Sequence, residues 1–141
     1  MWFKPYILFC PHTLTNFGYE GKEAIDAART EVLRAIWLCP QERFKIKMHP
    51  SQDDSYLYRD WKALYGIKNA EVIHKANTAK LIARAKLVIV QHSTVALEAL
   101  ELGVPVILME DEVSDVLGEF AEFGGLFMRA RTCEDILRLI S

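Results

Sequence analysis

The sequence predicts an α/β fold, a doubly wound parallel sheet of about six strands with helices on both faces. Short apolar runs alternate with helical patterns from one end of the chain to the other. Such alternation produces βαβ units with right-handed crossovers, and therefore a parallel, Rossmann-like sheet. The 141 residues contain no internal repeat, low-complexity segment or linker, so residues 1–141 are predicted to form a single domain with its own core.

Each predicted strand is an apolar run that ends at a proline, a glycine or a polar residue. The strands are 6–10, 44–48, 70–74, 86–90, 105–109 and 126–128. The run KLVIV at 86–90 is apolar after its lysine, which is typical of a strand buried on both faces. The run FKIKM at 44–48 instead alternates apolar and basic side chains.

The predicted helices carry apolar residues three or four positions apart and are bounded by capping residues. They occupy 20–38, 51–66, 77–85, 113–123 and 133–140, and a further helix opens at 92–94. In the second helix Leu57, Trp61 and Leu64 share one face, and the stripe formed by Leu57 and Trp61 is predicted to belong to the core. The residues expected to cap helices at their N-termini are Asn77 or Thr78, and Thr132.

The composition excludes several classes of partner. With a formal net charge of −2, the chain has neither the positive overall charge typical of nucleic-acid-binding proteins nor a polybasic membrane patch. Nucleic acid is therefore not expected as a partner. Cys10, Cys39 and Cys133 form no CxxC pair, which predicts free thiols in a reducing compartment. The N-terminal apolar run is too short for a secretory signal, and no run reaches the roughly 20 residues of a membrane span. The expected location is the cytoplasm, with association at the inner face of the membrane through a partner left open.

The residues directly after the strands form the candidate site, because ligands of doubly wound sheets bind beyond the carboxyl ends of the strands. All four histidines of the protein lie at such positions. The strand-end residues are Pro11-His12-Thr13, His49-Pro50-Ser51, His74-Lys75, Gln91-His92-Ser93-Thr94 and Glu110-Asp111-Glu112.

His92, Ser93 and Thr94 open the helix that follows the fourth strand. Backbone N–H groups and the helix dipole favour an anion there, but Ser and Thr also cap helices without binding a ligand. No Glu or Gln stands three residues after either hydroxyl, so a capping box is absent. The residues alone leave both interpretations open. Glu98, one turn into the helix, is placed to reach a ribose hydroxyl, whereas Glu101 is predicted to be a solvated charge.

The other strand ends also allow two interpretations. Pro50 stops the second strand and holds His49 in an extended conformation, which suits either an exposed turn or a ligand-binding histidine. His12 and His74 are each more typical of hydrogen-bonded loop histidines than of ligands. The EDE run at 110–112 is typical of a solvated helix start, with contact to a substrate as the alternative.

Several well-known motifs are absent from the sequence. It contains neither GxGxxG nor GxxxxGK[ST], which argues against a dinucleotide enzyme and a P-loop NTPase. It also lacks HExxH and other metal-ligand spacings, so no metal site is expected. No GxSxG elbow surrounds Ser93, which argues against a hydrolase nucleophile there.

The stretch HSTVALEALELGVPVI at 92–107, together with KMHP at 47–50, resembles the C-terminal, nucleotide-sugar-binding domain of GT-B glycosyltransferases. In that family a small polar mouth is followed by E-A-[LM], a short helix, G-x-P-V and a strand. The likeness is greatest to bacterial capsule and surface-polysaccharide transferases, including sialyl- and Kdo-transferases and the related CDP-glycerol glycerophosphotransferases. In several of these an HP motif and an [ST]-[ST] motif hold a cytidine nucleotide, and they correspond to His49-Pro50 and Ser93-Thr94 here.

The resemblance implies one half of a GT-B fold that binds a nucleotide sugar or a CDP-glycerol-type donor, with cytidine favoured over uridine and no cofactor or metal. It implies that Ser93 and Thr94 hold the donor phosphate and that Glu98 approaches the ribose. His49 would hold the nucleotide phosphate or assist departure of the leaving group. The remaining residues of the implied nucleotide-binding set are His12, Thr13, Pro50 and His92.

Two departures from the family pattern bear on activity. Retaining GT-B enzymes with an E-x7-E pattern carry an earlier glutamate, where this chain has Val90. GT-B enzymes also have an acceptor domain, with a D/E-D/E-G motif in the sialyltransferase-like families, and residues 1–141 contain neither. The resemblance therefore implies that an acceptor domain or partner chain binds the glycan or lipid-linked acceptor, and that this domain alone binds nucleotide with little or no transfer. Half of a GT-B-fold UDP-sugar 2-epimerase, or a stand-alone nucleotide-binding or partner-docking module, remains an alternative.

Overall fold

The computed structural model describes residues 5–12, 19–48, 55–91, 93–110 and 121–141. Six strands form one sheet in the order β3-β2-β1-β4-β5-β6, and every pairing is parallel. The strands are β1 (Tyr6–Cys10), β2 (Phe44–Lys47), β3 (Ala70–Ile73), β4 (Ala85–Val90), β5 (Val106–Met109) and β6 (Phe127–Ala130). The six-stranded parallel sheet predicted from the alternation of strands and helices is confirmed.

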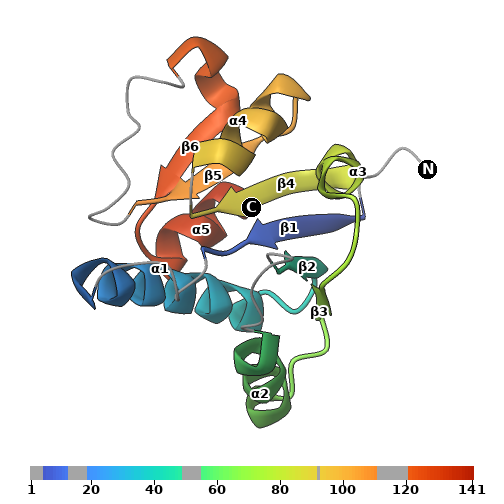
Figure 1. Cartoon of the computed structure of the whole chain (residues 1–141), viewed down its shortest axis with the longest axis vertical. Coiled ribbons are helices and arrows are strands. Elements are labelled where there is room, and N and C mark those ends of the chain that lie inside the picture. Colours follow the sequence, from blue (N-terminus) through green and yellow to red (C-terminus); the bar gives the residue numbers. More distant parts are fainter. Residues whose placement is uncertain (1–4, 13–18, 49–54, 92, 111–120) are drawn as a thin grey trace.

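Helices cover both faces of the sheet, as the fold class requires (Figure 1). They are α1 (Tyr19–Leu38), α2 (Ser55–Tyr65), α3 (Thr78–Arg84), α4 (Ser93–Glu101) and α5 (Cys133–Ile140), with a 3-10 segment η1 (Ala121–Leu126) before β6. Helices α1, α2 and α5 pack on one face, and α3 and α4 pack on the other. No helix in the described part of the chain is long and apolar enough to cross a membrane.

The two faces of the central strands each bury their own apolar layer. In β1, Ile7 and Phe9 face α1, α2 and α5, whereas Tyr6, Leu8 and Cys10 face α3 and α4. Each of these five side chains is at most 4% exposed. A strand covered on both faces must be apolar at every position, which explains why β1 and β4 lack the alternation of an exposed strand.

The helix caps form at the expected residues. Asn77 rather than Thr78 caps α3, and its side-chain oxygen accepts a hydrogen bond of 3.1 Å from the Lys80 backbone N–H. Thr132 caps α5 by accepting a hydrogen bond from the Asp135 backbone N–H, and the Asp135 carboxylate accepts one from the Thr132 backbone N–H, which completes a capping box. These polar residues stop the helices from extending into the neighbouring turns.

The apolar face of α2 is buried over only part of its length. Leu57 and Trp61 are partly buried against the core, as predicted, whereas Leu64 on the same face is 76% exposed. The reason is that α2 packs over β3, the edge strand of the sheet, and the sheet does not extend beneath the end of the helix.

The chain around η1 also differs from the prediction. The last strand begins at Phe127 and not at Leu126, which belongs to η1. Of the helix predicted at 113–123, residues 113–120 lie outside the described residues, and 121–123 belong to a 3-10 segment and not to an α-helix. Gly124, with φ of 56° and ψ of −130°, interrupts the helical conformation at this point.

Gly103 turns the chain from α4 into β5 with a φ of 75°. We expect Gly103→Ala to lower the free energy of unfolding by about 1–2 kcal/mol, because a side chain makes this left-handed conformation unfavourable. No atom lies within 4 Å of a Cβ built on Gly103, so the backbone conformation alone sets this cost. Urea denaturation of both proteins measures the change. The control is Gly125→Ala, at an exposed glycine whose φ is not positive. Equal losses for the two substitutions would contradict the explanation.

Candidate functional site

The order of the strands locates the expected ligand site. From β1 the chain adds β2 and β3 on one side, and then returns to add β4, β5 and β6 on the other side. Strands β1 and β4 are therefore neighbours at the point where the winding direction reverses. Open α/β sheets bind ligands outside the carboxyl ends of the strands at this switch point.

Buried polar side chains are concentrated at this same edge of the sheet. Among the described residues, the polar or charged side chains that are buried are those of Lys47, Ser55 and Gln91. Lys47 is the last residue of β2, Gln91 directly follows β4, and Ser55 is the first described residue after the β2–α2 connection. Burying a polar group is costly unless it is hydrogen-bonded. The position of these three side chains at one edge therefore indicates a region of the fold that is organised around polar contacts.

Gln91 connects three segments of the chain at the switch point. Its amide Nε2 donates a hydrogen bond of 2.8 Å to the Ile25 carbonyl oxygen in α1. Its Oε1 accepts a hydrogen bond of 3.1 Å from the His12 backbone N–H, just after β1. The side chain is fully buried. Gln91 therefore positions the backbone of His12 beside the end of β4.

Lys47 is a buried cation that connects the ends of β2 and β3. Its ammonium donates hydrogen bonds to the carbonyl oxygens of Met48, at 2.7 Å, and His74, at 3.0 Å. No carboxylate of the described residues forms an ion pair with it. An ammonium has three N–H donors, so this group still has capacity to donate to an anion.

The charges of Lys47 and Glu98 have opposite effects on the pKa of the Cys10 thiol. Burial raises the pKa of the Cys10 thiol to about 12, an effect that the positive charge of Lys47 opposes and the negative charge of Glu98 reinforces. The two charges that act on this thiol come from different elements, Lys47 from β2 and Glu98 from α4. The thiol stays protonated at neutral pH and is not a nucleophile there. Cys39 and Cys133 are also buried and free, as the sequence predicted.

The structure describes some of the predicted nucleotide-binding residues. His12 and Glu98 are half-buried and Thr94 is exposed at the start of α4, which begins at Ser93 as expected. The residues of the predicted set that lie outside the described residues are Thr13, His49, Pro50 and His92. The binding roles of all eight residues remain predictions.

Two other strand ends have local partners. Arg59 Nη2 donates a hydrogen bond of 3.0 Å to Nε2 of His74, in keeping with a hydrogen-bonded loop histidine. Glu110, the first residue of the EDE run, forms ion pairs with Arg129 at 3.0 Å and Arg131 at 3.2 Å. Asp111 and Glu112 lie outside the described residues. These two ion pairs therefore hold the Glu110 carboxylate against β6 and the residues that follow it.

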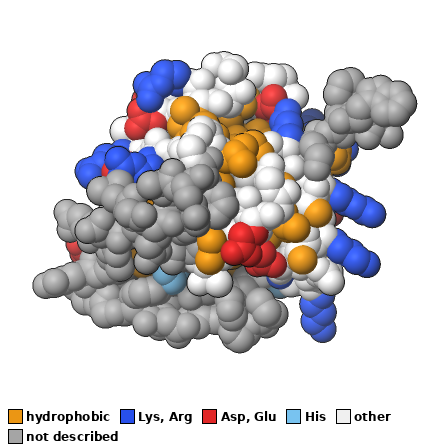
Figure 2. Space-filling model, turned by 90° about the horizontal axis from the view of Figure 1, so that it is seen from above, with side chains coloured by type: hydrophobic (Ala, Val, Ile, Leu, Met, Phe, Trp, Pro, Cys, Tyr) orange, Lys and Arg blue, Asp and Glu red, His pale blue; other side chains and the backbone are white. Residues whose placement is uncertain are grey.

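Binding of an anion at this edge would depend on local groups. On the face shown in Figure 2, both basic and acidic side chains appear among the described residues, without a continuous field of one sign. The described residues contain no cluster of three or more His, Cys, Asp or Glu side chains that could hold a metal ion. The local groups available for an anion are the N-terminus of α4 and the Lys47 ammonium.

The sequence placed Gln91 in the candidate strand-end set without a binding role, and it did not indicate Lys47 as a site residue. The sequence nevertheless contained a signal for Lys47. In a sheet that is covered on both faces, successive side chains of a strand point alternately into the two buried layers, so a lysine in such a strand faces a buried layer. The signal for Gln91 was its place in the strand-end set, directly after the most apolar strand.

Comparison with known proteins identifies the fold. No protein-family model and no curated protein matches the sequence. UDP-GlcNAc 2-epimerase from Neisseria meningitidis, in a crystal structure with UDP-GlcNAc, matches 96% of this chain and 34% of its own, with a TM-score of 0.67 and 17% identity. The Kdo transferase KpsC from Thermosulfurimonas dismutans matches 94% of this chain and 41% of its own, with a TM-score of 0.55 and 18% identity. The glycosyltransferase SnogD from Streptomyces nogalater matches 96% of this chain and 35% of its own, with a TM-score of 0.60 and 15% identity.

These matches define how far the likeness extends. The chain spans between 34% and 41% of the length of the three proteins. Identities of 15% to 18% establish the fold and not the activity. The chain has the fold of one Rossmann-like half of the GT-B architecture, which glycosyltransferases and UDP-GlcNAc 2-epimerases share.

Proposed function

We propose that the chain is the donor-binding domain of a glycosyltransferase or glycerophosphotransferase, which holds a nucleotide-activated donor for surface-polysaccharide synthesis. The observation that carries the proposal is the polar edge at the switch point, where Lys47 ends β2, Gln91 follows β4 and Glu98 lies on α4. Proteins that share the fold include a UDP-GlcNAc 2-epimerase with bound UDP-GlcNAc and a Kdo transferase.

In this proposal each group has a defined task. The N-terminus of α4, with Ser93 and Thr94, holds the donor phosphate by its N–H groups and hydroxyls. Lys47 adds a positive charge, and Glu98 accepts hydrogen bonds from the ribose. As the bond to the phosphate oxygen of the donor breaks, the helix dipole and Lys47 stabilise the negative charge that develops on the leaving group. His49 assists this departure, and the base that activates the acceptor belongs to a second domain or partner chain.

The test is calorimetric titration of the domain with CMP, CDP, UMP, UDP and GDP. We expect saturable binding of at least one nucleotide, with cytidine nucleotides preferred. Glu98→Gln is expected to weaken binding of the ribonucleotide about tenfold and binding of its 2′,3′-dideoxy analogue hardly at all, because only the former presents ribose hydroxyls to the carboxylate. The matched control is Glu101→Gln, on the same helix but exposed, which should change neither affinity. Absence of binding to all five nucleotides at millimolar concentration would refute the donor-domain proposal.

A second candidate is half of a UDP-sugar 2-epimerase. It is favoured by the TM-score of 0.67 to the Neisseria meningitidis epimerase, compared with 0.55 to the Kdo transferase. The two candidates differ in product. UDP-N-acetylglucosamine is incubated with the domain and its complementary half. If the chain is half of an epimerase, the product is the 2-epimer. If it is the donor domain of a transferase, the product is a transferred sugar.

A further inference from the structure

The surface between α1 and α2 contains two neighbouring cavities, and neither is lined by Lys47, Gln91 or Glu98. One, of about 530 Å³, lies between the two helices and the other, of about 580 Å³, lies at their ends, and Trp37 and Tyr65 line both. The second cavity reaches Arg43 and Lys68, which precede β2 and β3 and therefore lie toward the amino ends of the strands. We call the surface formed by the two cavities the α1–α2 groove. The volume of each cavity lies in the range of ligand-binding sites.

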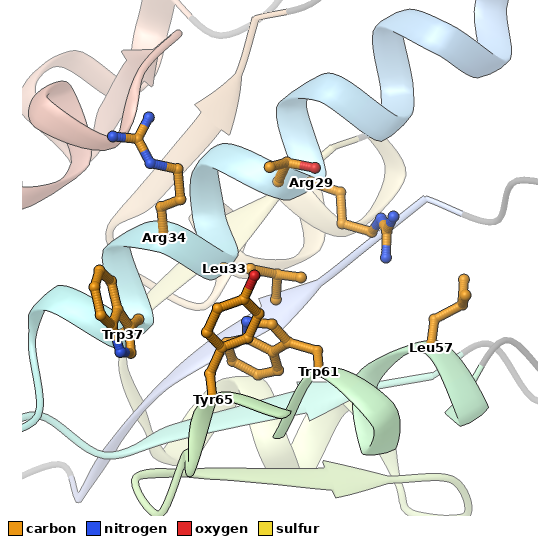
Figure 3. A pocket seen from close by; sticks show the side chains of 8 residues that line it. Arg29, Leu33, Arg34, Trp37, Leu57, Trp61 and Tyr65 are labelled. Carbon is orange, nitrogen blue, oxygen red and sulfur yellow. The ribbon is translucent and has the colours of Figure 1, made fainter. Parts of the chain in front are cut away.

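The groove exposes an unusual number of aromatic rings. Trp37 is 54% exposed and Tyr65 is 56% exposed, and their ring centroids lie 6.4 Å apart with planes inclined by 58°. Figure 3 shows Tyr65 and Trp61 on α2 directed toward Leu33 on α1, with Trp37 beside them. Large apolar side chains grouped at a surface indicate a binding site more often than isolated ones do. Trp and Tyr in particular suit partners with both apolar and polar parts.

The charged side chains that line the groove all have the same sign. They are Arg29, Arg34, Arg43 and Lys68, and no carboxylate is among the lining residues. Arg29 and Arg34 are neutralised in part by Asp26 and by Glu31 and Glu134. Arg43 and Lys68 form no ion pair with any residue that the structure describes. The end of the groove near β2 and β3 is therefore both aromatic and positively charged.

We propose that the α1–α2 groove binds an acidic oligosaccharide, a chain of sugar rings that carry carboxylates. The C–H face of a sugar ring packs against an indole or phenol ring, and this stacking places the hydroxyls at the rim, where side-chain donors reach them. Arg43 and Lys68 then form charge-assisted hydrogen bonds with the carboxylates of the next sugar along the oligosaccharide. Single-stranded nucleic acid uses the same two interactions, but domains that bind it are typically basic overall, whereas this chain has a formal net charge of −2.

The proposal is tested with tetragalacturonate, a linear tetrasaccharide with four carboxylates, and with uncharged maltotetraose as comparison. Two of the three tryptophans line the groove, so Trp2→Phe leaves fluorescence that reports on the groove alone. We expect saturable quenching by tetragalacturonate and an affinity for maltotetraose at least about tenfold lower, since only the former pairs with the cations. Tyr65→Ala is expected to weaken binding of tetragalacturonate about tenfold.

Matched controls separate the groove from the rest of the surface. Tyr56→Ala removes another exposed tyrosine of α2 that does not line the groove, and it should leave affinity unchanged. Lys68→Gln should weaken binding of tetragalacturonate but not of maltotetraose, whereas Lys62→Gln, on α2 outside the groove, should affect neither. Equal binding by the Tyr65→Ala variant, no quenching at millimolar tetragalacturonate, or tighter binding of a thymidine tetranucleotide would each overturn the proposal. None of these outcomes depends on whether the domain binds CDP or UDP.

Discussion

Replacing Lys47 with methionine is expected to weaken nucleotide binding at least tenfold without unfolding the domain. Methionine preserves most of the buried volume but removes the positive charge at the ends of β2 and β3. A charge-assisted hydrogen bond to phosphate contributes about 1.5–3 kcal/mol, which corresponds to tenfold or more in affinity. The substitution leaves the Met48 and His74 carbonyl oxygens without this donor, but it also removes the cost of burying the Lys47 charge, so we expect the domain to remain folded.

Parallel calorimetry and urea denaturation measure the two effects of Lys47→Met separately. The matched control is Lys45→Met, on the same strand and the same face, where the ammonium lies 4.5 Å from the centroid of the Tyr6 ring. Because Lys45 lies nearer the amino end of β2, its replacement should leave nucleotide affinity unchanged. If Lys47→Met lowered stability by several kcal/mol and left affinity intact, the role of Lys47 would be structural only.

Gln91→Leu is expected to lower the free energy of unfolding by about 2–4 kcal/mol. Leucine fits the apolar surroundings but can neither accept from the His12 N–H nor donate to the Ile25 carbonyl. The N–H group is left without this acceptor, and the helix loses a contact to the sheet. The value is large because the amide is fully buried and water cannot replace it.

Chemical denaturation of the Gln91→Leu variant provides the measurement. Gln41→Leu is the control, because the Gln41 side chain is exposed in the turn before β2 and its loss should cost less than about 0.5 kcal/mol. A loss below about 1 kcal/mol at Gln91 would mean that the segment after β1 is held by other contacts.

The fold class was predictable from the sequence because it depends on local patterns. Alternation of apolar runs and helical stripes identifies βαβ units without knowledge of any distant contact. The caps at Asn77 and Thr132 were predictable for the same reason, since each bonds to a backbone N–H within one helical turn. The exposure of Leu64 was not predictable, because the helical stripe identifies a face of α2 but not how far the sheet extends beneath it.

The candidate site was predictable only in outline. The strand ends could be listed from the chain, but their partners depend on the register of the sheet. Lys47 meets the His74 carbonyl because β2 pairs with β3, and Gln91 reaches Ile25 across 66 positions of sequence. No local pattern encodes such a contact. The roles of His12, Thr94 and Glu98 as ligand contacts stay predictions.

The two hydrogen bonds of the Gln91 side chain have a consequence for the order in which the domain folds. Its amide bridges positions separated by 79 and by 66 residues, so neither bond can form until the β1–β4 pairing has closed the longest loop of the sheet. Fragments that stop before β4 can build β1, α1, β2 and β3, but they lack the amide that fixes the segment after β1. The edge of the sheet at the switch point is therefore among the last parts of the molecule to be assembled. Under the proposed function, a nascent chain would bind a nucleotide there only after β4 is in place.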